Sequence, residues 1–176
     1  YFDLVKFLRK DMVISEHASW VFAAAPYVVF VTSLLVGLMV PTITNRAPLS
    51  LFGGVLAIIG LLALGRFFLA LGGLDPASAF GGMGSSREMT ISAIAEPAFM
   101  LAIFTVAITV GSTDLSQMVA TMQAASWKLL NPAYLLAFVA LFIVLLAETG
   151  RIPVDNPATH LELTMIHEAM LLEYSG

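Results

Sequence analysis

The sequence contains no cysteine, only three histidines and few charged residues, which make up 11% of its 176 residues. Without cysteine, the chain can form no disulfide and can supply no thiolate ligand to zinc or to an iron–sulfur cluster. We therefore expect it to bind no metal and no cofactor, and we expect any electron-transfer centre to lie on another chain. The net charge of −4 argues against nucleic acid as a partner, because contact with phosphates needs an excess of lysine and arginine.

Hydrophobic residues, in contrast, make up 59% of the chain, and the mean hydropathy is +0.93. This is far more apolar than a soluble domain. A helix of about 20 apolar residues crosses a hydrocarbon core of about 30 Å, and four stretches are long enough: 20–40, 49–71, 89–110 and 129–148. The sequence therefore predicts an all-α membrane protein, a polytopic transmembrane helix bundle that forms a single domain over residues 1–176.

The two ends of the chain differ from these spans. Residues 1–16 carry apolar side chains on one helical face and Lys6, Arg9 and Lys10 mostly on the other, which predicts an amphipathic interfacial helix. The same pattern also fits a helix that packs against a partner protein. Lysine and arginine in the short loops place the N-terminal segment, the 72–88 loop and the 149–176 segment in the cytoplasm by the positive-inside rule.

Two charged residues fall inside predicted spans. Glu96 is expected near the bilayer midplane, about 15 Å from the end of a helix that begins at Ser85 or Ser86. An ionised side chain there costs about 2.5–3.5 kcal/mol, so Glu96 should face the bundle interior, either as a proton-relay carboxylate or as a protonated residue that bonds a neighbouring helix. Arg66 lies nearer the cytoplasmic end of its span, and we expect its long side chain to extend to the lipid headgroups.

The segment before the third span has a local structural interpretation. Ser85-Ser86-Arg87-Glu88 matches a capping box, with Ser85 as the cap and Glu88 three residues later. Gly81-Gly82-Met83-Gly84 is expected to form a tight loop at the membrane surface, since it lacks the lysine and the preceding strand of a phosphate-binding loop. This interpretation explains Glu88 but leaves Arg87 without a role.

The segment that follows the fourth span is polar. Two prolines within residues 148–157 predict an irregular or re-entrant backbone. Clustered carboxylates in a partly dry site raise one another's pKa, which favours proton handling over the alternative, a solvated acidic loop that docks a partner. The spacing of the histidines matches no zinc motif such as H-E-x-x-H, so we predict no metal site. The ionisable residues after the prolines are His160, Glu162, His167, Glu168 and Glu173.

These residues resemble a known family, the membrane subunit shared by respiratory complex I and energy-converting membrane-bound nickel–iron hydrogenases. The stretch Glu148-Thr149-Gly150-Arg151-Ile152-Pro153-Val154-Asp155 is similar to the family's E-T-x-R-x-P-x-D signature, and Glu173-Tyr174-Ser175-Gly176 is similar to its E-Y-S-G. Arg87 and Glu96 resemble an arginine at the start of a membrane helix and a buried glutamate within it. Ala158 and His160 stand where complex I subunits usually have acidic residues, so the chain resembles hydrogenase-4 component C and formate hydrogenlyase subunit 4 more closely.

The resemblance implies that this chain is a fragment of a longer subunit of the inner (cytoplasmic) membrane, without catalytic activity of its own. The implied partners are the hydrogenase large and small subunits and an iron–sulfur subunit on the cytoplasmic side, which would hold the nickel–iron centre and the iron–sulfur clusters, together with antiporter-like membrane subunits. The chain would anchor these subunits and couple electron transfer to proton or sodium translocation. The implied ion path comprises Glu96, Glu148, Asp155, Glu162 and Glu173, with Arg87 and Arg151 as charge partners. We add Glu168 to this path by extrapolation, because it lies in the same acidic segment.

Three alternative functions remain open from the sequence. Within the same family, the chain can be the quinone-chamber membrane subunit of an NADH–quinone oxidoreductase. A non-catalytic membrane anchor would keep the docking segment but tolerate Glu96→Gln. A secondary transporter would show paired broken helices in an internal repeat, and the sequence contains no repeat that we can detect.

Overall fold

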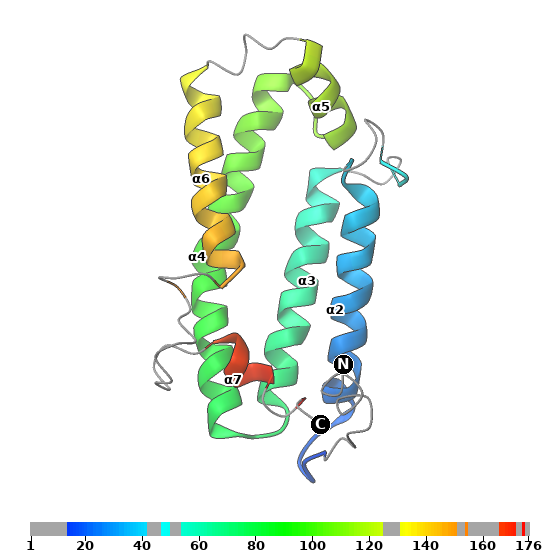
Figure 1. The fold of residues 1–176 in the computed structure, drawn as a ribbon, viewed down its shortest axis with the longest axis vertical. Helices are drawn as coiled ribbons and strands as arrows, with labels where there is room; N and C mark the ends of the chain where they lie inside the picture. The colour runs from blue at the N-terminus through cyan, green and yellow to red at the C-terminus, as the bar shows by residue number, and fades with distance from the viewer. Residues whose placement is uncertain are drawn as a thin grey trace, which may run out of the picture.

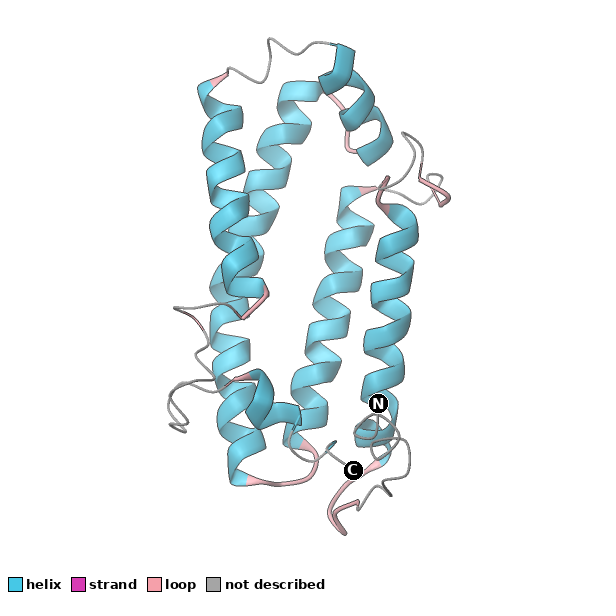
Figure 2. Ribbon diagram, viewed as in Figure 1, coloured by secondary structure: helices cyan, strands magenta, loops and turns pink. Residues whose placement is uncertain are grey.

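The computed structural model describes residues 14–41, 47–49, 54–124, 131–150, 154, 166–171 and 174. Within these residues the secondary structure is helical, and the only β-type pairing is an isolated bridge between Gly54 and Asp114 (Figure 2). The helices are α2 (Trp20–Met39), α3 (Val55–Leu74), α4 (Ala79–Val110), α5 (Leu115–Ala124), α6 (Pro132–Glu148) and α7 (His167–Leu171).

The helices are arranged as two pairs. Figure 1 shows α2 alongside α3 and α4 alongside α6, with α5 at one end of the bundle and α7 at the other. Helices α3 and α4 join the two pairs and pack most closely at the α7 end (Figure 1). At the α5 end, a cluster of buried apolar side chains forms the core: Val55, Ile59, Ala107 and Met118.

The helix lengths confirm the predicted class of fold. Helices α2, α3 and α4 are each long and apolar enough to cross a membrane. Helix α6 is equally apolar but has only 17 residues, which corresponds to about 25 Å at 1.5 Å per residue, against a hydrocarbon core of about 30 Å. The predicted interfacial helix over residues 1–16 lies almost wholly outside the described residues.

Local capping signals explain where several helices begin and end. Asn131 accepts a hydrogen bond from the backbone N–H of Ala133, and Pro132 is the first residue of α6. Helix α4 ends at Val110 and is capped by Gly111, whose φ of 82° lies in the left-handed region that glycine adopts without strain.

The start of α2 is capped by Ser19, whose hydroxyl accepts from the backbone N–H of Val21, and by a residue from the end of another helix. Asp75, just after α3, accepts hydrogen bonds from the Ser19 hydroxyl at 2.6 Å and from the backbone N–H groups of Ser19 and Phe22. The hydroxyl bond is the main reason why the pKa of Asp75 is lowered from its usual value. This carboxylate therefore fixes the junction between α2 and α3.

The structure corrects the predicted loop and capping box before the third span. Ser78 caps the helix, so the glycine-rich stretch at 81–84 is helical and Ser85 lies inside α4. The Ser85 hydroxyl instead donates to the carbonyl of Ala70 on α3, at 2.9 Å. The physical reason is close packing, because a Cβ atom at Gly84 would lie 2.8 Å from the carbonyl oxygen of Ile166. Contacts of this kind outweigh the cost of glycine in a helix, which is about 1 kcal/mol.

Tyr174, near the C-terminal end of the chain, packs against α2. Its ring stacks on Phe22 with a centroid distance of 4.0 Å, and its hydroxyl donates to the Phe22 carbonyl at 2.8 Å. Burial, with a smaller contribution from the charge of Asp75, raises the pKa of the Tyr174 hydroxyl. This residue of the E-Y-S-G motif therefore has a clear packing role.

Candidate functional site

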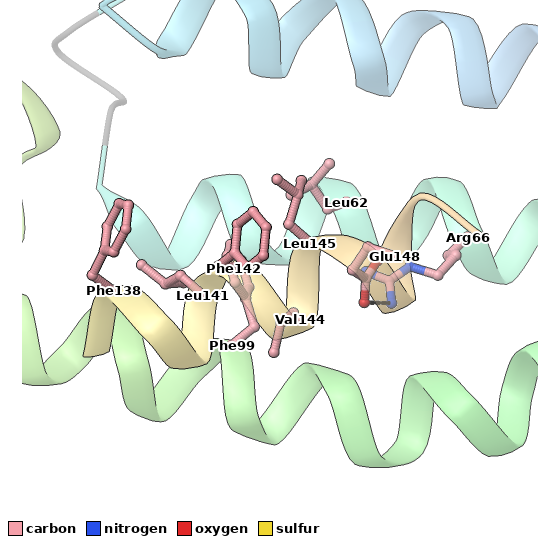
Figure 3. Close-up of a pocket in the computed structure, with 9 residues that line it drawn as sticks. All are labelled: Leu62, Arg66, Phe99, Phe138, Leu141, Phe142, Val144, Leu145 and Glu148. Carbon is pink, nitrogen blue, oxygen red and sulfur yellow. Dashed lines mark hydrogen bonds and ion pairs between the residues drawn. The ribbon is translucent and has the colours of Figure 1, made fainter. Parts of the chain in front are cut away.

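An arginine in the apolar part of α3 connects three helices. The Nη1 atom of Arg66 lies 2.6 Å from Oε1 of Glu148 at the end of α6 and 3.5 Å from Oε1 of Glu96 on α4. The same nitrogen donates a hydrogen bond to the Ser92 hydroxyl at 3.3 Å. Figure 3 shows the guanidinium of Arg66 facing the carboxylate of Glu148. Two carboxylates therefore share one guanidinium nitrogen.

The position of Arg66 contradicts the expectation that it extends to the headgroups. Arg66 lies eight residues before the end of α3, or about 12 Å along the helix axis, and its side chain is only 15% exposed. The side chains of Glu148 and Glu96 are 25% and 34% exposed. The prediction was wrong because carboxylates on two neighbouring helices neutralise the guanidinium within the bundle, which replaces solvation by headgroups.

The end of α6 adds to the negative potential at this site. Glu148 is the last residue of α6, and the Thr149 hydroxyl donates back to the Leu145 carbonyl at 2.7 Å. Gly150 follows with a φ of 54°, a left-handed conformation that ends helices. Because the C-terminal end of a helix carries a partial negative charge, Arg66 faces both the Glu148 carboxylate and the end of the helix dipole.

A polar row on α4 leads to the same site. Glu88, Ser92 and Glu96 are spaced four residues apart, which puts them along one side of the helix. Glu88 and Ser92 are 7% and 6% exposed. The interpretation of Glu88 as part of a capping box is therefore wrong, because Glu88 lies inside α4 and is buried.

Sequence reasoning missed two residues of this site, although signals for both were present. Arg66 interrupts an otherwise apolar span, and a charged residue inside a transmembrane helix usually faces the bundle interior and pairs with another polar group. Glu88 falls in register with Ser92 and Glu96, a spacing that becomes visible once α4 is known to begin before it.

An apolar groove adjoins the Arg66–Glu148 pair. It has a volume of about 620 Å³ and lies between α3, α4 and α6 (Figure 3). In surroundings of this kind water screens charges weakly, so the interactions of Arg66 with its carboxylates are stronger than at a protein surface. Its apolar lining consists of Leu62, Phe99, Phe138, Leu141, Phe142, Val144 and Leu145.

The other predicted site residues are not joined to this cluster by the described contacts. Arg87 is partly exposed and forms no ion pair with any carboxylate in the described part of the chain, so its role as a charge partner stays a prediction. Glu168 belongs to α7, but its side chain is not described. Asp155, Glu162, Glu173 and Arg151 lie outside the described residues. Among the residues that are described, no group of three or more acidic or histidine side chains can hold a metal ion.

Comparison with known proteins identifies the family. A family model described as NADH dehydrogenase matches residues 1–176. Formate hydrogenlyase subunit 4 of Escherichia coli K12 is 33% identical over 177 residues, which cover 100% of this chain and 56% of the relative. Hydrogenase-4 component C of the same organism is also 33% identical, with 100% and 54% covered. An NADH-quinone oxidoreductase subunit of Syntrophotalea carbinolica is 33% identical over 187 residues, with 99% and 54% covered.

The chain therefore spans about half the length of the curated relatives that it matches. The matches include both branches that the motifs indicate, the hydrogenase branch and the complex I branch, and they confirm the resemblance drawn from Glu148–Asp155 and Glu173–Gly176. The chain is a helical membrane protein that belongs to the NADH dehydrogenase family, the family of complex I subunit 1.

Proposed function

We propose that this chain is part of the ion-coupling membrane subunit of an energy-converting complex, of the membrane-bound nickel–iron hydrogenase or formate hydrogenlyase type. Its relatives include formate hydrogenlyase subunit 4 and hydrogenase-4 component C. The complex would lie in the cytoplasmic membrane, with the nickel–iron centre and iron–sulfur clusters on subunits that dock at the cytoplasmic end. The observation that carries the proposal is the contact of one Arg66 nitrogen with Glu148 and Glu96 inside the apolar bundle.

Competition between the two carboxylates is the basis of the coupling. The contact of Arg66 with Glu148 is short and that with Glu96 is longer, 2.6 Å against 3.5 Å. If the guanidinium moves towards Glu96, Glu148 loses its counter-charge. Because an isolated charge is costly at this depth, Glu148 then takes up a proton, and it releases the proton when Arg66 returns.

The energies of this exchange are suited to ion translocation. Moving one charge across 100 mV requires about 2.3 kcal/mol. Breaking a buried ion pair by removal of one partner costs about 3–5 kcal/mol. A partial shift of Arg66 between its two partners therefore involves free energies of the same size as the translocation step. Electron transfer in a docked subunit would bias this equilibrium through acidic residues nearer the cytoplasm, for which Asp155, Glu162, Glu168 and Glu173 are the predicted candidates.

The test is Glu96→Gln in the full-length subunit within its native complex. Inside-out membrane vesicles report electron transfer and coupled ion uptake separately. We expect electron transfer to continue while ion uptake falls about tenfold or more, since loss of a proton-transfer group typically costs about 10²–10⁴-fold in rate. The matched control is Glu16→Gln, which neutralises an exposed glutamate outside the helices. Normal ion uptake in the Glu96 variant would contradict coupling and leave a membrane anchor, whereas loss of assembly would indicate a structural role.

The type of complex is tested separately by the composition of the purified material. Nickel and iron with little flavin or quinone would support the hydrogenase assignment. Flavin and quinone without nickel would instead support the alternative, an NADH–quinone oxidoreductase.

A further inference from the structure

Pro26 leaves one backbone carbonyl of α2 without its regular helical hydrogen bond. Proline has no N–H group, and in an α-helix the N–H of residue 26 would bond the carbonyl of Phe22, four residues earlier. Pro26 lies inside α2, and Phe22 is only 2% exposed. A buried carbonyl without a donor costs free energy comparable to a lost hydrogen bond. Helix α2 therefore needs a donor from another part of the chain at this turn.

Tyr174 supplies that donor. Its hydroxyl donates to the Phe22 carbonyl at 2.8 Å, and the two rings are stacked with an interplanar angle of 5°. The hydroxyl fits because Gly72 on α3 has no side chain, since a Cβ atom there would lie 2.6 Å from the hydroxyl oxygen. A proline, a glycine and a tyrosine from three distant segments thus form one contact.

The N–H group of Phe22 also depends on a residue outside α2. Phe22 belongs to the first turn, whose N–H groups have no acceptor within the helix, and it donates to Asp75 at 3.2 Å. Asp75 follows directly after α3. Both backbone polar groups of Phe22 are therefore bonded to other segments, so this turn of α2 depends on the position of those segments.

Tyr174 links the same turn to α7, which lies at this end of the bundle (Figure 1). Tyr174 and Leu171, the last residue of α7, line a cavity of about 430 Å³ together with Pro26. The other lining residues come from α2 and α3, and apart from Ser33 they are apolar. Water binds poorly in a cavity with so few polar groups, so it is a weak substitute for the Tyr174 hydroxyl.

We propose that Tyr174 is a positioning residue that holds the C-terminal segment, residues 149–176, against α2 through the carbonyl that Pro26 leaves free. When the tyrosine is in place, the hydrogen bonding of α2 is complete. When it is displaced, the Phe22 carbonyl loses its donor, so the position of the segment and the structure of α2 depend on each other. In the complex, this contact would hold the acidic segment in register for ion coupling, and that part of the proposal rests on the proposed function.

The test is a rescue experiment in the full-length subunit in mixed micelles. Tyr174→Phe keeps the ring but removes the donor, and it should raise the rate of protease cleavage within residues 149–176 about fivefold. Pro26→Ala supplies an N–H group that can bond the Phe22 carbonyl, so cleavage of the double variant should stay within about twofold of Pro26→Ala alone. A tyrosine that acts only through ring packing would not be rescued. The matched control is Tyr27→Phe, at a position on α2 that is 74% exposed, and it should keep wild-type cleavage.

A second measurement tests the link to ion coupling. In inside-out vesicles that contain the complex, the number of ions taken up per electron transferred should fall about threefold in Tyr174→Phe. The double variant with Pro26→Ala should recover most of this ratio, because the segment is again held against α2.

The outcomes separate the contact from its role. Wild-type cleavage in Tyr174→Phe, or no recovery with Pro26→Ala, would overturn the proposal. If Tyr174→Phe does not assemble, the double variant decides, since assembly should return in it, and a failure to assemble would again overturn the proposal. Rescued cleavage with an unchanged uptake ratio would reject the role of the contact in coupling, whereas the coupling function itself fails only if Glu96→Gln also shows normal ion uptake.

Discussion

Replacing Arg66 with methionine tests the ion-pair cluster most directly. The substitution keeps a long side chain of similar volume but removes the guanidinium that contacts Glu148 at 2.6 Å and Glu96 at 3.5 Å. At an effective dielectric constant of about 20, these two attractions amount to roughly 6 and 5 kcal/mol before desolvation is subtracted. Most of this gain is offset by the cost of taking the charges out of water.

The expected net loss of stability on replacing Arg66 lies near the lower end of the range of about 3–5 kcal/mol that breaking a buried ion pair typically costs. Because the carboxylates of Glu148 and Glu96 are 25% and 34% exposed, they recover part of their solvation when Arg66 is absent. We therefore expect Arg66→Met to lower the free energy of unfolding by about 3 kcal/mol, or roughly a 100-fold change in the unfolding equilibrium. Unfolding of the full-length subunit in mixed micelles, titrated with a denaturing detergent, measures this quantity.

A double-mutant cycle shows whether the loss comes from the ion pair. Glu148→Gln in the Arg66→Met background should restore part of the stability, with an interaction energy of about 2 kcal/mol between the two sites. The control pair, Arg66→Met with Glu16→Gln, should be additive within about 0.5 kcal/mol. If the Arg66 and Glu148 substitutions are additive to the same degree, Arg66 and Glu148 do not interact, and the reasoning for the cluster fails.

Three further predictions concern packing and capping. Gly84→Ala should weaken the attachment of α7, seen as faster proteolysis of the C-terminal segment, because its Cβ atom would lie 2.8 Å from a backbone carbonyl; Gly82→Ala, with nothing within 4 Å, is the matched control and should keep wild-type cleavage. Tyr174→Phe should cost about 0.5–1.5 kcal/mol of stability, measured by the same unfolding titration, because it removes one hydrogen bond but keeps the ring stack. Because the pKa of Asp75 is lowered in the folded protein, its ionised carboxylate stabilises the fold fully above the unfolded pKa of 3.8. This stabilisation is lost as the pH falls through the lower folded pKa. The unfolding midpoint should therefore fall at acidic pH in the wild type, and this dependence should be smaller in Ser19→Ala.

The sequence alone determines the type of fold and several local features. A small soluble domain cannot bury the apolar surface of a chain with 59% hydrophobic residues. The prediction of a membrane helix bundle therefore follows from the composition. The start of α6 follows from Asn131 and Pro132, because capping depends only on residues adjacent in the chain. The family follows from short motifs that are read directly.

Tertiary structure alone decides which charged residues meet. Arg66 is separated from Glu148 by 82 positions and from Ser92 by 26, so no local pattern specifies their contact. Whether Arg66 extends to the headgroups or pairs within the bundle depends on which carboxylates the neighbouring helices bring within reach. Likewise, the glycine-rich stretch before Glu88 becomes helical because α3 and α7 pack closely against it, and contacts between distant segments outweigh its weak local preference.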